Sequence, residues 1–230
     1  MSTWFDERVT CPSCATEQTA RLARGVHVAR APEARDQVFD RTFHRVTCTA
    51  CGVRFVAQRP LVYTDMDRRH WIQVALAIER PRWPELEEAT GNIFERAFVG
   101  SPLAASLREG MKVRLVFGME ELREKLVIWR AGLDDGVVEC VKVQAFAREP
   151  ALSRAHRLLV DEVTADHLVI LVEDHADQPP RASFVPRALA DAAHDDYARL
   201  RRTFPELFGA PFVSTHRLLG HRYRPVEPTD

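Results

Sequence analysis

The chain has 230 residues, 46% of them hydrophobic and 28% charged, and its formal net charge is −1. This length and composition predict ordinary globular cores and favour two domains over one or three. The near balance of charge argues against a general basic coat for nucleic acid and against an acidic tail. Arginine supplies almost all of the basic charge, a bias that indicates a GC-rich bacterial genome rather than a function.

We expect neither a signal peptide nor a membrane span. Residues 1–9 carry charged side chains and no apolar core, unlike a secretory signal. The longest apolar stretches, around 74–78 and 168–172, are far too short to cross a bilayer. We therefore expect a cytoplasmic, reducing compartment, where paired C-x-x-C motifs are more often metal sites than disulfides.

Two strand–knuckle–strand units are expected at the N-terminal end. The knuckles are Cys11-Pro12-Ser13-Cys14 and Cys48-Thr49-Ala50-Cys51-Gly52. Alternating and β-branched residues predict the strands that enter and leave them, at 3–10, 17–30, 43–47 and 53–62. This order is typical of a zinc ribbon, which we expect to close at 63–65. The 33 residues between the knuckles exceed what a minimal ribbon needs and predict extended hairpin arms.

Helices and strands are expected to alternate in the middle of the chain. The prolines and acidic residues around Pro84 favour a helix start there. Gly132 is a suitable helix end, and Asp134 or Asp135 a suitable cap for the helix that follows. The predicted elements are a short apolar strand or helix at 71–78, a helix ending near residue 98, a strand at 112–117, and helices at 120–130 and 137–146.

The segment 147–153, which contains Pro150, is the expected boundary, and it gives domains 1–149 and 150–230. Beyond it we predict a hairpin of strands 158–163 and 167–172, a turn at 179–180, a helix over 186–203 and a last strand over 215–223. The expected fold class is α+β. It comprises an N-terminal four-cysteine zinc ribbon of antiparallel strands with an attached helical segment, then a small α+β C-terminal part.

The knuckle cysteines carry the strongest chemical signal in the sequence. Zn²⁺ binds four thiolates in a closed tetrahedron, and a C-x-x-C turn brings two sulfurs to one ion. Disulfides and a redox dithiol are the alternatives, but a thioredoxin-type dithiol needs its motif at the head of a helix, which neither knuckle has. A full shell leaves no position for water or substrate, so we expect structural zinc. The predicted ligands are Cys11, Cys14, Cys48 and Cys51.

A second signal lies in the run from Leu115 to Lys125, Leu-Val-Phe-Gly-Met-Glu-Glu-Leu-Arg-Glu-Lys, followed by Gly-Leu-Asp-Asp at 132–135. With the two knuckles, this run resembles the CpXC family of bacterial and archaeal proteins, over roughly the first two-thirds of the chain. The resemblance implies a zinc-binding N-terminal module with no established activity. Thr49 stands where the family's second motif would carry proline. Because that position does not ligate, we expect little effect on metal binding.

The remaining candidate groups have ordinary explanations. Cys140, the fifth cysteine, lies among valines of a predicted helix and is expected to be a buried core thiol. His27 and His44 lie between the knuckles as surface groups or as supports for the metal ligands. Helix capping and solvation account for the carboxylates of 120–135. The His/Asp-rich segment 166–196 lacks metal-binding spacings and is interpreted as a charged surface, with a second metal site as the alternative.

The sequence contains no phosphate loop, nucleophile elbow or Rossmann fingerprint, so we expect no enzymatic activity and no small-molecule substrate. The favoured function is a zinc-stabilised cytoplasmic interaction or scaffold module, with an unknown protein partner or a second copy of the chain. A nucleic-acid-binding or transcription-associated zinc ribbon is the alternative, although acidic neighbours reduce its basic surplus to a few charges. The arginines that would serve it are Arg21, Arg24, Arg45 and Arg54.

Overall fold

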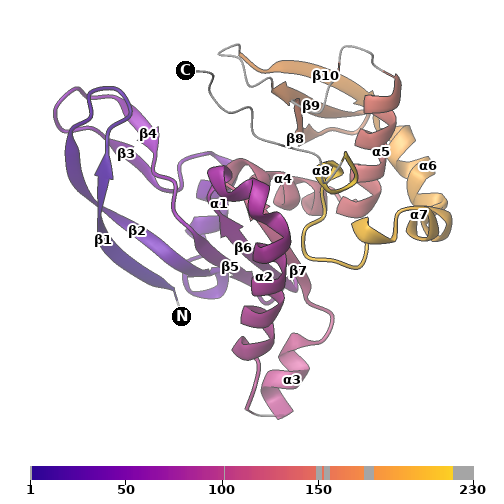
Figure 1. Ribbon diagram of the computed structural model, residues 1–230, viewed down its shortest axis with the longest axis horizontal. Coiled ribbons are helices and arrows are strands. Elements are labelled where there is room, and N and C mark those ends of the chain that lie inside the picture. The colour runs from indigo at the N-terminus through magenta and orange to yellow at the C-terminus, as the bar shows by residue number, and fades with distance from the viewer. Residues whose placement is uncertain (1, 101, 149–151, 153–155, 174–178, 220–230) are drawn as a thin grey trace, which may run out of the picture. The chain divides into compact units, whose positions relative to one another are not determined.

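A computed structural model describes residues 2–100, 102–148, 152, 156–173 and 179–219 (Figure 1). The protein is α+β, with 42% helix and 31% strand, which confirms the expected class. Contacts divide the chain into two compact units, Met1–Leu126 and Val127–Asp230. This division by contacts falls earlier than the domain boundary expected at 147–153. Where the boundary between separately folding domains lies stays a prediction. No helix among the described residues is long and apolar enough to cross a bilayer.

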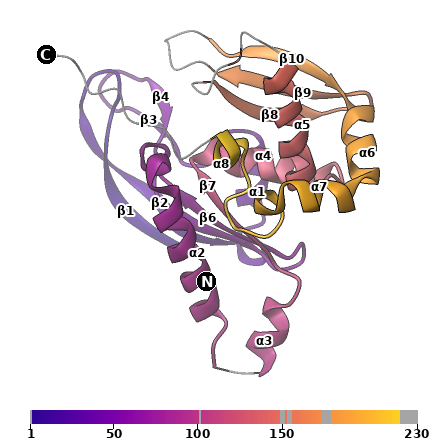
Figure 2. The ribbon, with the colours of Figure 1, turned by 45° about the vertical axis from the view of Figure 1, so that its right-hand side comes forward.

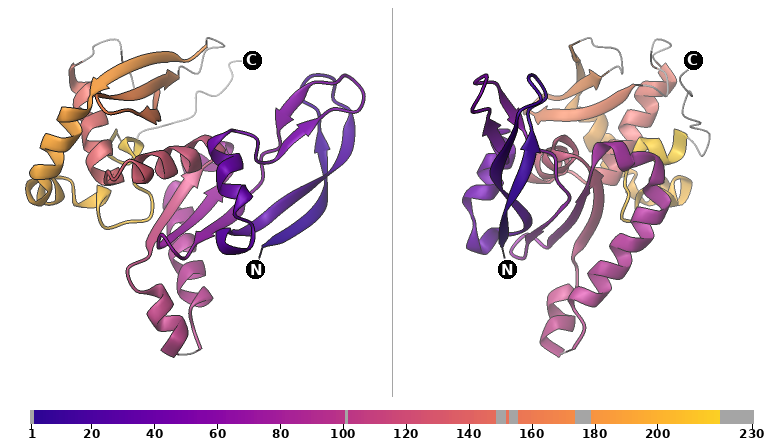
Figure 3. Two further views of the ribbon diagram at one scale, coloured as in Figure 1. Left: turned by 180° about the vertical axis from the view of Figure 1, so that it is seen from behind. Right: turned by 60° about the vertical axis from the view of Figure 1, so that its left-hand side comes forward.

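The first unit is built on a five-stranded sheet with the order β1-β2-β5-β6-β7. Its strands are β1 (Thr3–Thr10), β2 (Glu17–His27), β5 (Leu61–Asp65), β6 (His70–Ala75) and β7 (Lys112–Phe117). The outer hairpin β1–β2 pairs along its whole length, but only residues 25–27 of β2 pair with β5, in parallel. The rest of this hairpin therefore projects from the sheet, as Figure 3 shows.

The projecting part, which we call the arm, consists of β1, residues 17–24 of β2, and a second hairpin. That hairpin pairs β3 (Arg45–Thr47) with β4 (Arg54–Val56). Between β2 and β3 the chain forms a short 3-10 turn, η1 (Val28–Arg30), and helix α1 (Glu33–Phe39). Between its strands the arm holds a small apolar cluster of three buried residues with three partly buried ones packed against them: Val9, Leu22 and Ala57, then Ala20, Val46 and Phe55.

The main core of the first unit lies at β5, β6 and β7. Tyr63, Ile72 and Leu115 are among its fully buried side chains. Helix α2 (Trp83–Ala97) begins with a proline in its first turn, as expected, and packs through Phe94 on Trp71, with ring centroids 5.4 Å apart. The 3-10 segment η2 (Ala77–Arg82) precedes α2, and helix α3 (Pro102–Arg108) follows it.

A buried carboxylate fixes the turn from β7 into α4 (Met119–Arg130). Gly118 takes a φ of +86°, which glycine adopts without strain. One oxygen of Glu121 then accepts the Phe117 N–H at 2.7 Å, and the other pairs with Arg80. Glu121 is only 6% exposed, and Glu124 and Asp135 are also buried. The expectation that solvation explains these carboxylates is therefore wrong, and Glu121 bonds to the last N–H of β7 rather than to an N–H of its own helix.

The second unit surrounds helix α5 (Asp135–Arg148), which is buried on all sides over 135–142. Gly132 follows α4 with a φ of +77°, and the Asp134 side chain accepts the N–H groups of Gly136 and Val137, as its expected capping role requires. A Cβ atom at Gly136 would lie 2.7 Å from the Leu207 carbonyl oxygen, so only glycine permits this close packing.

A three-stranded antiparallel sheet and short helices complete the second unit (Figure 2). The sheet order is β10-β9-β8, with β8 (Arg157–Val163), β9 (His167–Glu173) and β10 (Arg181–Pro186). The helical segments are α6 (Arg187–Asp195), α7 (Tyr197–Thr203), η3 (Pro205–Leu207) and α8 (Thr215–Leu219). The β8–β9 hairpin confirms the predicted one.

Two predictions for the second unit are wrong. The helix expected over 186–203 is interrupted at Asp196, whose backbone leaves the helical region, and the strand β10 precedes it. The last strand expected over 215–223 is instead helix α8 up to Leu219, while 220–223 lie outside the described residues. The helix start is favoured because the Ser214 hydroxyl and carbonyl accept N–H groups from His216 and Arg217.

Cys140 is the buried core thiol that its position predicted. It packs with Val137, Leu200 and Leu207 in the core of the second unit. Burial raises the pKa of its thiol to about 12, because the charged thiolate loses its solvation there.

Candidate metal centre

The four knuckle cysteines meet at the end of the arm. Cys11 and Cys14 lie in the turn between β1 and β2, and Cys48 and Cys51 lie in the turn between β3 and β4. Their four Sγ atoms all lie within 4.8 Å of one another. Two of these separations join one knuckle to the other, at 3.7 Å for Cys11–Cys51 and 3.6 Å for Cys14–Cys48.

Both knuckles have the same backbone construction. In each, the first cysteine donates its N–H to a carbonyl beyond the turn, Cys11 to Thr16 at 2.9 Å and Cys48 to Val53 at 2.8 Å. The residue after the second cysteine then takes a left-handed conformation, with φ +58° at Ala15 and +74° at Gly52. Such turns aim two sulfurs at a common point, and the two points coincide here.

The donor set fits a tetrahedral thiolate site. Four sulfurs about 2.3 Å from a central zinc ion would lie about 3.8 Å apart, close to the two cross-knuckle separations. Thiolates select soft metals such as zinc or iron in this geometry. Cys11 and Cys48 are buried, whereas Cys14 and Cys51 face solvent. All five cysteines of the chain are free, so no disulfide competes for these sulfurs.

The thiols influence one another's ionisation. The Thr16 hydroxyl, 3.3 Å from Sγ, and the Thr16 backbone lower the pKa of Cys14 to about 6. The backbone at Cys51 and Ala50 likewise lowers the pKa of Cys48. The Val53 backbone lowers the pKa of Cys51, but the neighbouring cysteine sulfurs, with some loss of solvation, outweigh it and raise that pKa to about 12. Four crowded thiolates repel one another, and a divalent cation at their centre would remove that repulsion.

His44 is buried inside the first unit, where its side chain contacts the arm, and it is not a surface group. Its ring is 7% exposed, stacks on Phe43 at 4.2 Å, and accepts the Ala23 N–H at 2.8 Å through Nε2. Its backbone is left-handed, with a φ of +58°. The cysteine group contains no histidine among the residues that the structure describes. Burial lowers the pKa of His44 to about 4, because the charged ring would lose its solvation.

We expect His44 to make the protein less stable as the pH falls from about 6.5 to about 4. In that window the unfolded chain binds a proton at this residue and the folded chain does not, which costs about 3 kcal/mol over the whole range. Denaturant unfolding at several pH values measures the effect, with His44→Asn as the control because asparagine tolerates the left-handed backbone. Protonation of the cysteines affects both proteins, so parallel pH curves would contradict the role of His44.

The His/Asp-rich segment forms no metal cluster within its described part. Its aspartates pair with nearby arginines instead, Asp196 with Arg199 and Asp191 with Arg187 at 3.7 Å. These contacts agree with a charged surface. His175, Asp174 and Asp177 lie outside the described residues.

The four arginines of the nucleic-acid alternative lie on exposed positions of three strands of the arm, β2, β3 and β4. Arg24 is neutralised by Glu7 at 2.7 Å and lies over the Phe5 ring. Arg21 lies opposite Asp6 across the hairpin, and the Arg45 guanidinium donates to the Arg41 carbonyl. The acidic partners on β1 thus oppose the basic surplus, and the binding role of these arginines stays a prediction.

Two polar residues beside the first knuckle have contacts that the sequence analysis missed. Thr16 contacts Cys14, and Gln18 reaches across to the second knuckle. Their only signal in the sequence is that they follow a knuckle within four residues. That signal is weak because polar residues are common next to turns.

Comparison with known proteins bears on the whole N-terminal region. A model of the CpXC protein family matches residues 9–142, which is more than half of the chain. The match includes both knuckles and the segment from β7 through α4 into α5. Searches of curated proteins and of solved structures gave no match. The chain therefore belongs to the CpXC protein family.

Proposed function

We propose that the chain is a non-catalytic interaction or scaffold module of the reducing cytoplasm, whose arm is stabilised by one structural zinc ion. The observation that carries the zinc assignment is the convergence of four free thiols, two from each hairpin, within 4.8 Å. When bound, zinc would cross-link the two hairpins through the four thiolates. The proposed ligands are Cys11, Cys14, Cys48 and Cys51.

The composition of the arm supports a stabilising role for the metal. Its apolar cluster around Val9, Leu22 and Ala57 is small, which is little apolar area for two hairpins. Binding of structural zinc supplies on the order of 10 kcal/mol of folding free energy in small zinc domains. The ion would therefore be the main support of the knuckle end of the arm.

The closed ligand set supports a non-catalytic role. Four thiolates fill a tetrahedral zinc shell, and catalytic zinc needs an open position for water or substrate. The arm projects from the sheet of the first unit and exposes polar strands around the centre. A rigid projecting element of this kind is suited to contacting another macromolecule, either a protein partner or a second copy of this chain.

Metal analysis of the full chain, purified without chelators, tests the first half of the proposal. We expect one zinc per chain, and we expect cobalt substitution to give the visible spectrum of a tetrahedral thiolate site. Iron or an empty site would contradict the zinc assignment.

Capture from a lysate of the native host and light scattering of the pure protein test the second half. A defined protein partner or a dimer supports the interaction role. Salt-dependent shifting of a random DNA or RNA probe would replace it with nucleic-acid binding.

A further inference from the structure

The two knuckles differ at the residue after their first cysteine. Knuckle one has Pro12, whose ring fixes the backbone φ near −65°. Knuckle two has Thr49 at the same place, and threonine leaves that torsion free. Because the backbone hydrogen bonds of the two knuckles correspond, the second knuckle needs another source of rigidity to hold the same geometry.

Gln18 makes three hydrogen bonds that supply such rigidity. Its Oε1 atom accepts the Thr49 N–H at 2.8 Å and lies 3.2 Å from the Thr49 hydroxyl. Its Nε2 atom donates to the Thr47 carbonyl at 2.9 Å. Both the oxygen and the nitrogen of the amide are thus hydrogen-bonded, and their partners are the two residues on either side of Cys48.

The position of Gln18 makes this contact a link between the two halves of the centre. Gln18 lies on β2, four residues after Cys14, and pairs across the hairpin with Val9. Thr47 and Thr49 belong to the other hairpin, about thirty residues further along the chain. A change at Gln18 would therefore loosen the second knuckle relative to the first without touching any sulfur.

We propose that Gln18 is a positioning residue of the metal centre, which holds Cys48 and its knuckle in the metal-binding conformation, as the ring of Pro12 does for the first knuckle. This inference rests on the proposed zinc site. A knuckle that is held in place re-forms its metal–sulfur bonds before the ion escapes. Removing the hydrogen bonds that hold it should therefore speed metal release. Groups that orient metal ligands in this way change metal affinity by about 10- to 100-fold when they are removed.

The test is the rate at which zinc passes from the full, zinc-loaded chain to an excess of a chromogenic chelator. Gln18→Met keeps the length of the side chain and removes the three hydrogen bonds, and we expect release about tenfold faster than from the wild type. Adding Thr49→Pro to this variant should return the rate toward the wild-type value, because the ring replaces the lost constraint. A merely structural role of Gln18 in β2 would not respond to a proline in the other hairpin.

Thr19→Met is the matched control, since it places the same side chain on the opposite face of the strand, and it should release zinc at the wild-type rate. If Gln18→Met does not fold, Gln18→Glu keeps the acceptor for Thr49 and loses the donor to Thr47, and its release should be faster than that of the wild type. Release from the zinc-loaded Gln18 variant at the wild-type rate, or no rescue by Thr49→Pro, overturns the inference alone. A wild-type chain that holds no zinc overturns the proposed function as well.

Discussion

Cys14→Ser is expected to abolish stoichiometric zinc binding and to unfold the knuckle end of the arm. Cys14 is exposed, and the substitution of an exposed residue ordinarily changes stability by no more than about 0.5 kcal/mol. A metal ligand at the same position is different, because removing it forfeits much of a binding free energy on the order of 10 kcal/mol. We therefore expect a loss of several kcal/mol, measured by denaturant unfolding together with metal analysis. Cys51→Ser, at the other exposed thiol, should behave alike.

Cys140→Ser is the matched control for this prediction. Cys140 is 1% exposed and lies in the core of the second unit, outside the cysteine group. Burying a hydroxyl there should cost about 1–3 kcal/mol while the zinc content stays at one per chain. A chelator should destabilise the wild type and Cys140→Ser equally and leave Cys14→Ser unaffected. Full zinc content in Cys14→Ser would refute the site.

Local signals gave some strands of the first unit their correct bounds, but the single strand expected over 53–62 is two, β4 and β5, and residues 63–65, expected to close the ribbon, belong to β5. Strand β1 occupies the predicted residues 3–10, because the alternating residues end at a cysteine turn that stops the strand. Strand β7 likewise occupies 112–117, where apolar and basic residues alternate. Knuckle spacing alone predicted that four cysteines from two distant segments would converge, since each C-x-x-C turn is incomplete as a metal site without the other.

The burial of helix α5 and the contacts of Gln18 depend on tertiary packing, which local sequence signals do not reveal. Helix α5 was expected, but its burial on all sides was not, because Glu139 and Lys142 indicate an exposed face when only periodicity is considered. The role of Gln18 was missed for a related reason. Its partners, Thr47 and Thr49, lie on another hairpin, and a single glutamine in a strand gives no sign of the residues that it will meet.

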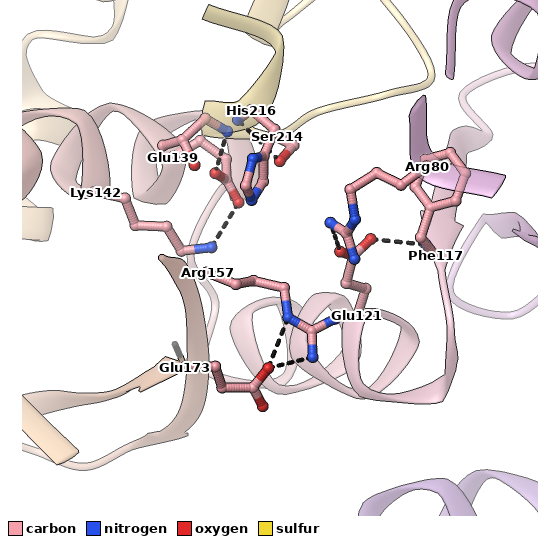
Figure 4. Close-up of polar contacts among 10 residues, drawn as sticks. Arg80, Phe117, Glu121, Glu139, Lys142, Arg157, Glu173, Ser214 and His216 are labelled. Atoms are coloured by element: carbon pink, nitrogen blue, oxygen red, sulfur yellow. Dashed lines mark hydrogen bonds and ion pairs between the residues drawn. The ribbon is translucent and has the colours of Figure 1, made fainter. Parts of the chain in front are cut away.

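The buried pair in α5 gives the second large expected effect. The Lys142 ammonium lies 2.7 Å from one oxygen of Glu139, and both side chains are 2% exposed (Figure 4). The other oxygen of Glu139 accepts the Thr215 N–H at 2.7 Å and so links α5 to the start of α8. Glu139→Ala removes both contacts in one step and leaves a buried cation without this partner. We expect a loss of about 3–5 kcal/mol in the free energy of unfolding, measured by denaturant.

Two further variants separate the charge from the hydrogen bond. Glu139→Gln keeps an acceptor for Thr215 but removes the charge that faces Lys142, so its cost should be lower than that of Glu139→Ala. The double variant Glu139→Leu, Lys142→Met replaces both charges with apolar groups of similar size and should recover most of the stability, because neither charge of the pair remains buried without the other. A double variant whose loss equals the sum of the two single losses would show that the residues act independently. Strong recovery would instead show that the stability lost in a single variant comes from the charge that has lost its partner. In the double variant the α8 amides should then regain their protection from hydrogen exchange only as far as the Thr215 N–H finds another acceptor.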